Sequence, residues 1–331
     1  MTFPGARPVA ILAVLLITLL DVSIEGQSKK KKKSTPKKKT AVTRKAPAKK
    51  KAAPPAPALP VGRTFEERLA SLVNGSVARS SDASIQIVEV ESGRAVAERN
   101  PHLPLSPASN MKLFTTAAAI DLLEPSFEVE TGVYVRGDID ASGTLNGDVK
   151  IVGRGDPTIG GRFHDGAATA VLQEWASDLK RAGVKNITGD LILEYGYMDT
   201  EYIHPTWPAD QLVNWYEAPI SAFSMQEGCV EVRVLPSRVG QPCVVQLEPP
   251  TSYVNIQNTC RTGRGLPFIT RHRGSNTVIV RGGVPARSGA REVFVTVENP
   301  VHYFAAVTNE TFQRAGIRIM GKVALSPRDG R

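Results

Sequence analysis

The segment "PLSPASNMKLFTTAAAIDLL", Pro104–Leu123, decides how the rest of the chain is interpreted. It places Ser109 and Lys112 three residues apart at the start of an apolar, alanine-rich stretch that follows a Pro-x-x-Pro sequence. The apolar residues of this stretch recur at helical spacing, which predicts a helix. Because residues i and i+3 of a helix lie on one face, the Lys112 amine can reach the Ser109 hydroxyl.

This pair has two interpretations, one catalytic and one structural. A serine hydroxyl becomes a good nucleophile when a base removes its proton, and a lysine that is buried or lies near other cations can be that base. The positive end of the helix dipole would also stabilise a developing oxyanion beside Ser109. Alternatively, Ser109 only caps a structural helix. Ser-x-x-Lys also begins at Ser28, Ser34 and Ser177, but only Ser109 opens an apolar helix.

The basic charge of the chain is confined to one segment. Residues 29–63 contain 14 Lys and Arg and no acidic residue, and residues 1–28 carry a net charge of −1. Subtracting +14 and −1 from the total of +9 leaves −4 for residues 64–331. The Lys/Ala/Pro composition predicts a disordered basic linker that binds anionic membrane or cell-wall polymers or acts only as a spacer. We do not expect nucleic acid as a partner.

The N-terminal residues 1–28 are typical of an export signal. Arg7 precedes an apolar run of twelve residues, Val9–Leu20, which is too short to span a bilayer comfortably. The small-x-small cleavage pattern after this run is poor, so an uncleaved membrane anchor also fits. We expect an exported protein of the periplasm or cell envelope.

Cysteine and histidine positions argue against a metal site. Cys229, Cys243 and Cys260 allow one of three disulfides and leave one thiol over. The chain has no Cys-x-x-Cys sequence, and its five histidines are scattered without ligand spacing. We therefore expect no metal.

The order of predicted elements indicates an α/β (α+β) fold. The expected elements are a helix within 65–75, a hairpin over 83–99, the Ser109 helix, strands with Gly/Asp turns from 126, a helix within 166–184 that stops at Gly183, further strands dominating Ile187–Val297 and a last helix within 300–316.

Four segments together resemble one protein family. "PASNMKLFTTAAAIDLL" is similar to the active-site segment of penicillin-binding proteins of the D-alanyl-D-alanine carboxypeptidase/endopeptidase family that has a large inserted region. Further similar segments, in the same order as in the family, are "GTLNGDVKIVGRGDPTIGG" (143–161), "WPADQLVNWYEAPISAFSMQEG" (207–228) and "VENPVHYFAAVTNETFQRAGIRIMG" (297–321). The resemblance implies an incomplete transpeptidase/β-lactamase-like domain. Residues 64–125 would be its N-terminal part, and residues 126–331 a strand-rich insertion that ends near the return to the catalytic domain.

The resemblance also implies a reaction. Ser109 would form an acyl-enzyme with peptidoglycan stem peptides, Lys112 would act as its base, and water would release the product. β-Lactams would be covalent inhibitors. This chemistry needs a serine, a base and an oxyanion pocket, but no cofactor.

Two motifs of the family are absent from the chain. Such enzymes combine Ser-x-x-Lys with Ser-x-Asn and Lys-Thr-Gly, and neither of the latter occurs here. Tyr253-x-Asn255 and Arg261-Thr262-Gly263 are partial matches, but they lie too close together and are interpreted as strand and turn. Arg154-Gly155-Asp156 is likewise interpreted as part of a turn rather than as an adhesion motif.

In the family the two motifs follow the Asn-Pro helix segment, after which this sequence stops at Arg331. We therefore expect a truncated or catalytically incomplete member that is weakly active or inactive. Its Ser109 helix would leave Met111, Leu113 and Phe114 exposed. The alternative function is a non-catalytic protein that binds peptidoglycan or an envelope protein through the same scaffold.

Overall fold

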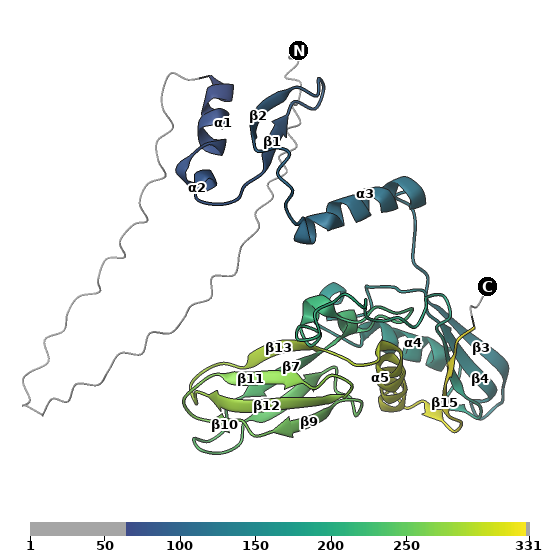
Figure 1. The fold of residues 1–331 in the computed structure, drawn as a ribbon. Coiled ribbons are helices and arrows are strands. Elements are labelled where there is room, and N and C mark those ends of the chain that lie inside the picture. Colours follow the sequence, from purple (N-terminus) through teal and green to yellow (C-terminus); the bar gives the residue numbers. More distant parts are fainter. Residues whose placement is uncertain (1–63, 329–331) are drawn as a thin grey trace, which may run out of the picture. The chain divides into compact units, whose positions relative to one another are not determined.

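The computed structural model describes residues 64–328, which belong to two compact units that meet between Phe127 and Glu128 (Figure 1). The predicted signal peptide or anchor, residues 1–28, and the predicted basic linker, residues 29–63, lie outside the described residues. None of the helices within 64–328 has the length and apolar character needed to cross a bilayer. The boundary expected between residues 125 and 126 separates the transpeptidase-like part from its insertion. This boundary stays a prediction.

The first unit consists of short elements. They are α1 (Phe65–Val73), α2 (Ser76–Arg79), β1 (Ile85–Val88), β2 (Ala95–Arg99), the 3-10 turn η1 (Ala108–Asn110) and α3 (Met111–Leu123). A capping box starts α1, because the Thr64 hydroxyl accepts from the Glu67 amide while the Glu67 carboxylate accepts from the Thr64 amide. β1 and β2 pair antiparallel, which confirms the predicted hairpin.

The first unit buries little apolar surface. Within residues 64–127 only Val73 and Ala97 are buried apolar residues. Both Phe65 and Leu72 of α1 are more than half exposed. Because burial of apolar surface is the main force that stabilises a fold, these segments contribute little packing free energy of their own.

The second unit is built around a six-stranded mixed sheet of order β14-β5-β4-β6-β15, with β3 antiparallel to β4. Its strands are β3 (Gly132–Ile139), β4 (Thr144–Val152), β5 (Asn186–Ile187), β6 (Leu191–Glu194), β14 (Arg318–Ile319) and β15 (Val323–Ser326). One sheet is therefore formed by two segments that lie far apart in sequence, β4 to β6 and β14 to β15.

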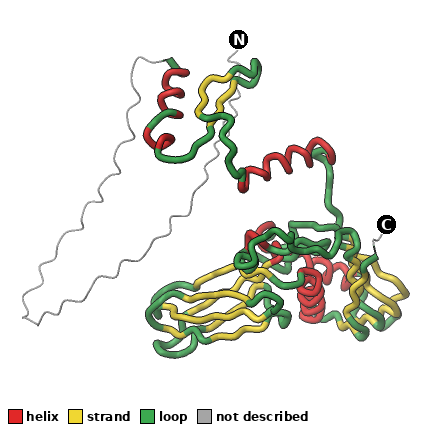
Figure 2. The backbone as a smooth tube through the Cα atoms, in the orientation of Figure 1, coloured by secondary structure: helices red, strands yellow, loops and turns green. Residues whose placement is uncertain are grey.

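Helices α4 (Ala170–Arg181) and α5 (Pro300–Arg314) lie beside this sheet (Figure 2). Gly183, at φ +94°, follows α4, as predicted from the sequence. Asn299 caps α5 by accepting from the His302 amide at 3.0 Å. Phe304 of α5 is fully buried, and its ring centroid lies 4.6 Å from that of Phe223. The apolar faces of both helices thus form one core with the sheet.

Two smaller sheets complete the second unit. One has the order β13-β7-β8, and the other has β10-β12-β11 with β9 paired to β12. The strands are β7 (Cys229–Leu235), β8 (Val244–Glu248), β9 (Asn255–Asn258), β10 (Arg261–Thr262), β11 (Pro267–Arg271), β12 (Thr277–Val284) and β13 (Arg291–Thr296). The mixed α/β fold predicted from the sequence is confirmed.

The prediction that strands dominate Ile187–Val297 is wrong for residues 195–228. No strand is assigned in this segment. Its regular elements are two 3-10 turns, η3 (Trp215–Glu217) and η4 (Gln226–Gly228). Pro205, Pro208 and Pro219 fall within it, and proline cannot donate to a strand ladder.

The structure brings two of the three cysteines together. The Sγ atoms of Cys243 and Cys260 lie 3.2 Å apart, and the Cys243 amide donates to the Cys260 carbonyl at 2.9 Å. Burial, with a further contribution from the Cys243 thiol, raises the pKa of Cys260 to about 11. Burial and the Glu227 charge raise the pKa of Cys229, which lies elsewhere in the unit, to about 12. All three are free thiols in the structure.

We predict that oxidative refolding with glutathione disulfide joins Cys243 to Cys260 and leaves Cys229 reduced. Trypsin then releases Val239–Arg261, which contains both joined cysteines and no internal Lys or Arg, lighter by two hydrogen atoms in non-reducing mass spectrometry. In the folded, reduced chain the same thiols should alkylate slowly near neutral pH. Alkylation of Cys260 should accelerate as pH rises toward its pKa of about 11, because the thiolate is the reactive form. A cross-link between Val239–Arg261 and the Cys229 peptide Asn186–Arg233 would contradict the assignment.

Candidate active site

Ser109 lies in the 3-10 turn η1, which leads directly into α3. The sequence predicts Ser109 in the first turn of an α-helix. The α-helix begins two residues later than this prediction. The Asn110 amide donates to the Pro107 carbonyl at 2.8 Å, and Asn110 Nδ2 donates to the same oxygen at 3.0 Å. These two bonds tighten the turn around Ser109.

Lys112 Nζ donates a hydrogen bond to Ser109 Oγ at 3.1 Å. The structure thus brings together the two predicted site residues. The other Ser-x-x-Lys pair within residues 64–328 is engaged differently: Ser177 Oγ donates to the Gln173 carbonyl at 2.8 Å, and Lys180 Nζ donates to the Ala315 carbonyl at 3.0 Å. Of these two pairs, only Ser109–Lys112 has a hydrogen bond between its own lysine amine and serine hydroxyl.

The backbone just before Ser109 is strained. Ala108 has φ +44°, in the left-handed region that a residue with a Cβ rarely adopts. This conformation costs about 1–2 kcal/mol, and such residues cluster at functional sites. The sequence contained no signal for it, because alanine at this position predicts ordinary helical geometry.

Lys112 and Ser109 are both exposed. A lysine acts as a base only in its neutral form, which burial favours. The described residues therefore supply the contact between the two groups, but not the burial that the catalytic interpretation requires.

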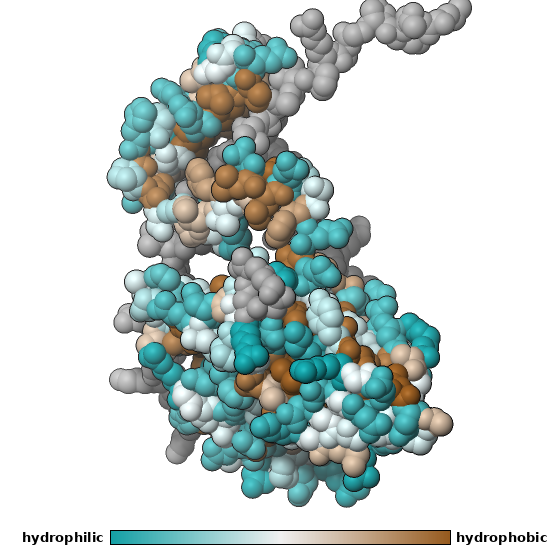
Figure 3. Space-filling view, turned by 90° about the vertical axis from the view of Figure 1, so that its right-hand side faces the viewer, coloured by the Kyte–Doolittle hydropathy of each residue, from teal (hydrophilic) through white to brown (hydrophobic). Residues whose placement is uncertain are grey.

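α3 has no buried residue. Met111, Leu113 and Phe114 are 51%, 57% and 68% exposed, which confirms the exposure predicted for them. Figure 3 shows apolar side chains (brown) at the surface of the first unit. The helix that carries Lys112 thus buries none of its apolar side chains within the first unit.

The partial motifs lie in the second unit. Asn255 starts strand β9, and Arg261 and Thr262 form strand β10, as interpreted from the sequence. Tyr253 donates its hydroxyl to the Asn299 carbonyl at 3.0 Å, and burial raises its pKa. These residues serve the fold of the insertion.

Arg154-Gly155-Asp156 is likewise a turn. Gly155 has φ +86°, and Asp156 Oδ1 accepts from the Thr158 amide at 2.8 Å. Residues 64–328 contain no group of three or more His, Cys, Asp or Glu side chains placed to hold a metal ion.

A model of the D-Ala-D-Ala carboxypeptidase 3 (S13) family matches residues 65–329. The chain belongs to this family. The resemblance predicted from the sequence is thereby confirmed, and the match includes the Ser109–Lys112 pair as well as the whole described second unit.

Two curated relatives are D-alanyl-D-alanine carboxypeptidases. The protein of Actinomadura sp. (strain R39) is 28% identical over 272 residues, which cover 79% of this chain and 49% of the relative. The Haemophilus influenzae protein DacB is 22% identical over 269 residues, which cover 79% of this chain and 54% of the relative. The chain thus spans about half the length of the curated relatives it matches.

A solved structure with a similar fold is penicillin-binding protein 4 (dacB) of Haemophilus influenzae. It has a TM-score of 0.60 at 21% identity, and the match covers 74% of this chain and 53% of that structure. A second structure of that protein, complexed with a β-lactam, has a TM-score of 0.53 at 20% identity. Both confirm the fold predicted for the chain.

We predict that trypsin cleaves the folded chain after Lys112 much faster than after Lys180. Both lysines are exposed, but α4 is anchored by buried Leu172 and Leu179, whereas α3 has no buried residue. A helix without packing opens locally at little cost in free energy. N-terminal sequencing of the first fragments measures the order of cleavage, and earlier cleavage after Lys180 would show that α3 is covered in solution.

Proposed function

We propose that the chain carries the nucleophile and base of a serine-type D-alanyl-D-alanine carboxypeptidase/endopeptidase that acts on peptidoglycan stem peptides. The observation that carries this proposal is the 3.1 Å hydrogen bond between Lys112 and Ser109 at the entry of α3. Membership of the carboxypeptidase family supports it.

In the proposed reaction neutral Lys112 accepts the Ser109 proton as Oγ attacks the carbonyl carbon of the penultimate D-alanine. The C–N bond then breaks, and the terminal D-alanine leaves as an amine after it takes up a proton. Water attacks the resulting ester and releases the shortened peptide, which restores Ser109. The positive end of α3 favours the oxyanion formed in both steps.

We infer that this chain as given is only weakly active. It contains neither Ser-x-Asn nor Lys-Thr-Gly, and Lys112 is exposed. The described residues thus lack the burial that would favour a neutral lysine as the base.

We further propose that the protein is exported to the periplasm or cell envelope, where peptidoglycan is found. The apolar run Val9–Leu20 would direct export, and the basic residues 29–63 would bind anionic membrane or cell-wall polymers. β-Lactams would acylate Ser109 as covalent inhibitors. A structure of the similar Haemophilus influenzae protein is named as a complex with a β-lactam.

One observation favours a second function. The exposure of Lys112 and the lack of any buried residue in α3 are what a protein that no longer catalyses would tolerate. In that case the second unit, with its fully formed core, would act as a peptidoglycan- or protein-binding module.

Release of D-alanine from a peptide that ends in D-Ala-D-Ala separates the two functions. We predict slow release by the 331-residue chain, complete loss in Ser109→Ala and no change in Ser177→Ala. The second variant removes the serine of the Ser-x-x-Lys pair whose hydroxyl and amine are bonded elsewhere.

Release that does not exceed the Ser109→Ala background, measured on a chain whose circular dichroism shows it to be folded, would favour the binding module. Equal loss in Ser177→Ala would show that the release belongs to a contaminant or to general destabilisation.

A further inference from the structure

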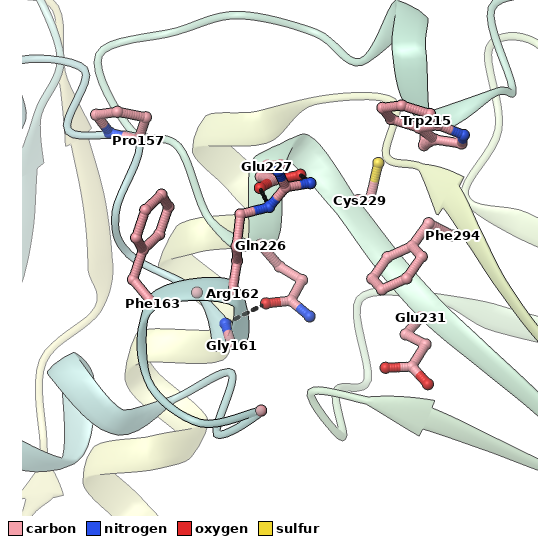
Figure 4. A pocket seen from close by; sticks show the side chains of 12 residues that line it. Pro157, Gly161, Arg162, Phe163, Trp215, Gln226, Glu227, Cys229, Glu231 and Phe294 are labelled. Atoms are coloured by element: carbon pink, nitrogen blue, oxygen red, sulfur yellow. Dashed lines mark hydrogen bonds and ion pairs between the residues drawn. The ribbon is translucent and has the colours of Figure 1, made fainter.

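The second unit contains a pocket of about 450 Å³ whose lining includes neither Ser109 nor Lys112. This volume suits a small organic ligand. Figure 4 shows its two walls. Pro157, Arg162 and Phe163 line one wall, and Trp215, Glu231 and Phe294 line the other.

The aromatic residues of the pocket are unusually exposed. Trp215 is 59%, Phe163 56% and Phe294 42% exposed. β7 presents Cys229 and Glu231 to the pocket on the face opposite its core valines, and Phe294 pairs with Glu231 across the β13–β7 ladder. The rims therefore offer flat apolar faces that water contacts unfavourably.

Gln226 supplies a fixed hydrogen-bond donor at the floor. Its side chain is 8% exposed, and its Oε1 accepts from the Gly161 amide at 2.7 Å. This bond fixes the plane of the carboxamide so that Nε2 points into the hollow (Figure 4). Within residues 64–328 Nε2 donates to no protein acceptor, and it is not among the fully buried polar atoms that lack a partner, so it is open to a ligand in the hollow.

The backbone at this donor is strained. Gln226 and Glu227 have φ +50° and +57°, two successive non-glycine residues in the left-handed region. Strain of this kind persists where the surrounding structure holds a residue for a function. The surrounding structure thus holds Gln226 in this backbone conformation, which lowers the folding stability of the unit.

The charges at the pocket are compensated within the protein. The Arg162 guanidinium pairs with the Glu227 carboxylate, and Glu231 lies 3.6 Å from Arg233. An anionic ligand such as a phosphate would find no free cation among these residues, whereas the Glu231 carboxylate, whose neighbour Arg233 donates to Glu292 at 3.0 Å, can accept from hydroxyl groups. The pocket therefore suits an uncharged ligand that has both apolar faces and a hydrogen-bond acceptor.

We propose that this pocket binds an N-acetylated amino sugar. The C–H faces of a pyranose ring pack on aromatic rings such as Trp215 and Phe163, and the acetamido carbonyl accepts from Gln226 Nε2. Ring hydroxyls donate to Glu231. That the sugar comes from the glycan strands of peptidoglycan rests on the proposed function, because stem peptides are attached to those strands.

A sugar site in the insertion would hold the glycan while the attached stem peptide is presented to the serine. Binding would thereby raise the local concentration of the peptide without any contact to it. The proposal deepens the function by adding a glycan-recognition step that does not use Ser109.

Saturation-transfer NMR of the 331-residue chain with N,N′-diacetylchitobiose tests the site. We predict transfer to the acetamido methyl protons with a dissociation constant of about 1 mM, typical of a weak single-site contact. Cellobiose, which has the same ring faces but no acetamido group, should give at least tenfold weaker binding. The disaccharide of N-acetylglucosamine and N-acetylmuramic acid distinguishes a peptidoglycan source from a chitin-like one.

Three variants locate the binding. Trp215→Ala removes a ring face, and Gln226→Glu keeps an oxygen for the Gly161 amide but replaces the Nε2 donor. Each should weaken binding at least tenfold. Phe268→Ala removes an aromatic residue of similar exposure (49%) that does not line the pocket, and it should leave binding unchanged.

Absence of transfer from both acetylated disaccharides to the folded chain would overturn the proposal. Equal binding of cellobiose, or binding unaffected by Trp215→Ala, would do so as well. Ser109→Ala separates this proposal from the proposed function: it should leave sugar binding intact, whereas loss of peptidase activity alone says nothing against the pocket.

Discussion

The hydrogen bond from Lys112 Nζ to Ser109 Oγ is the contact on which any chemistry of this chain depends. It exists because a 3-10 turn and the first turn of α3 place the two residues on one side of the backbone. The strained Ala108 and the two bonds from Asn110 to the Pro107 carbonyl hold that turn. The local sequence thus assembles the pair, although the helix that carries it buries none of its side chains.

The two units differ in how they are stabilised. In the second unit the sheets and helices α4 and α5 enclose a continuous apolar core that includes Phe223, Phe304 and Phe312. In the first unit, capping and a hairpin provide local order with little apolar burial. Recognition by a fixed pocket is therefore a function that the second unit can perform by itself, whereas catalysis at Ser109 requires α3 to be packed.

Much of this arrangement could be predicted from the sequence. Gly183 after α4, Asn299-Pro300 before α5 and the alternating pattern of the 83–99 hairpin are local signals, and each gave the correct element. Ser109 and Lys112 were found by helical spacing together with the similarity of several segments to one family. Their catalytic roles remain predictions.

Other features depend on long-range packing that local patterns do not encode. The approach of Cys243 to Cys260 results from the pairing of Pro242 with Arg261, which lie far apart in the chain. The left-handed geometry at Ala108 and Gln226 is imposed on residues that do not favour it. The pocket joins a loop near Arg162 to strands β7 and β13, so no single stretch of sequence indicates it.

The most direct test of the central claim, that Ser109 is the nucleophile, is to map the site of benzylpenicillin acylation. Trypsin places Ser109 in the peptide Asn100–Lys112, and fragmentation distinguishes it from Ser106 in the same peptide. After prolonged incubation the account predicts slow addition of one penicilloyl group to Ser109. A penicilloyl group on another serine, or an unmodified Asn100–Lys112 peptide from folded protein, would contradict it.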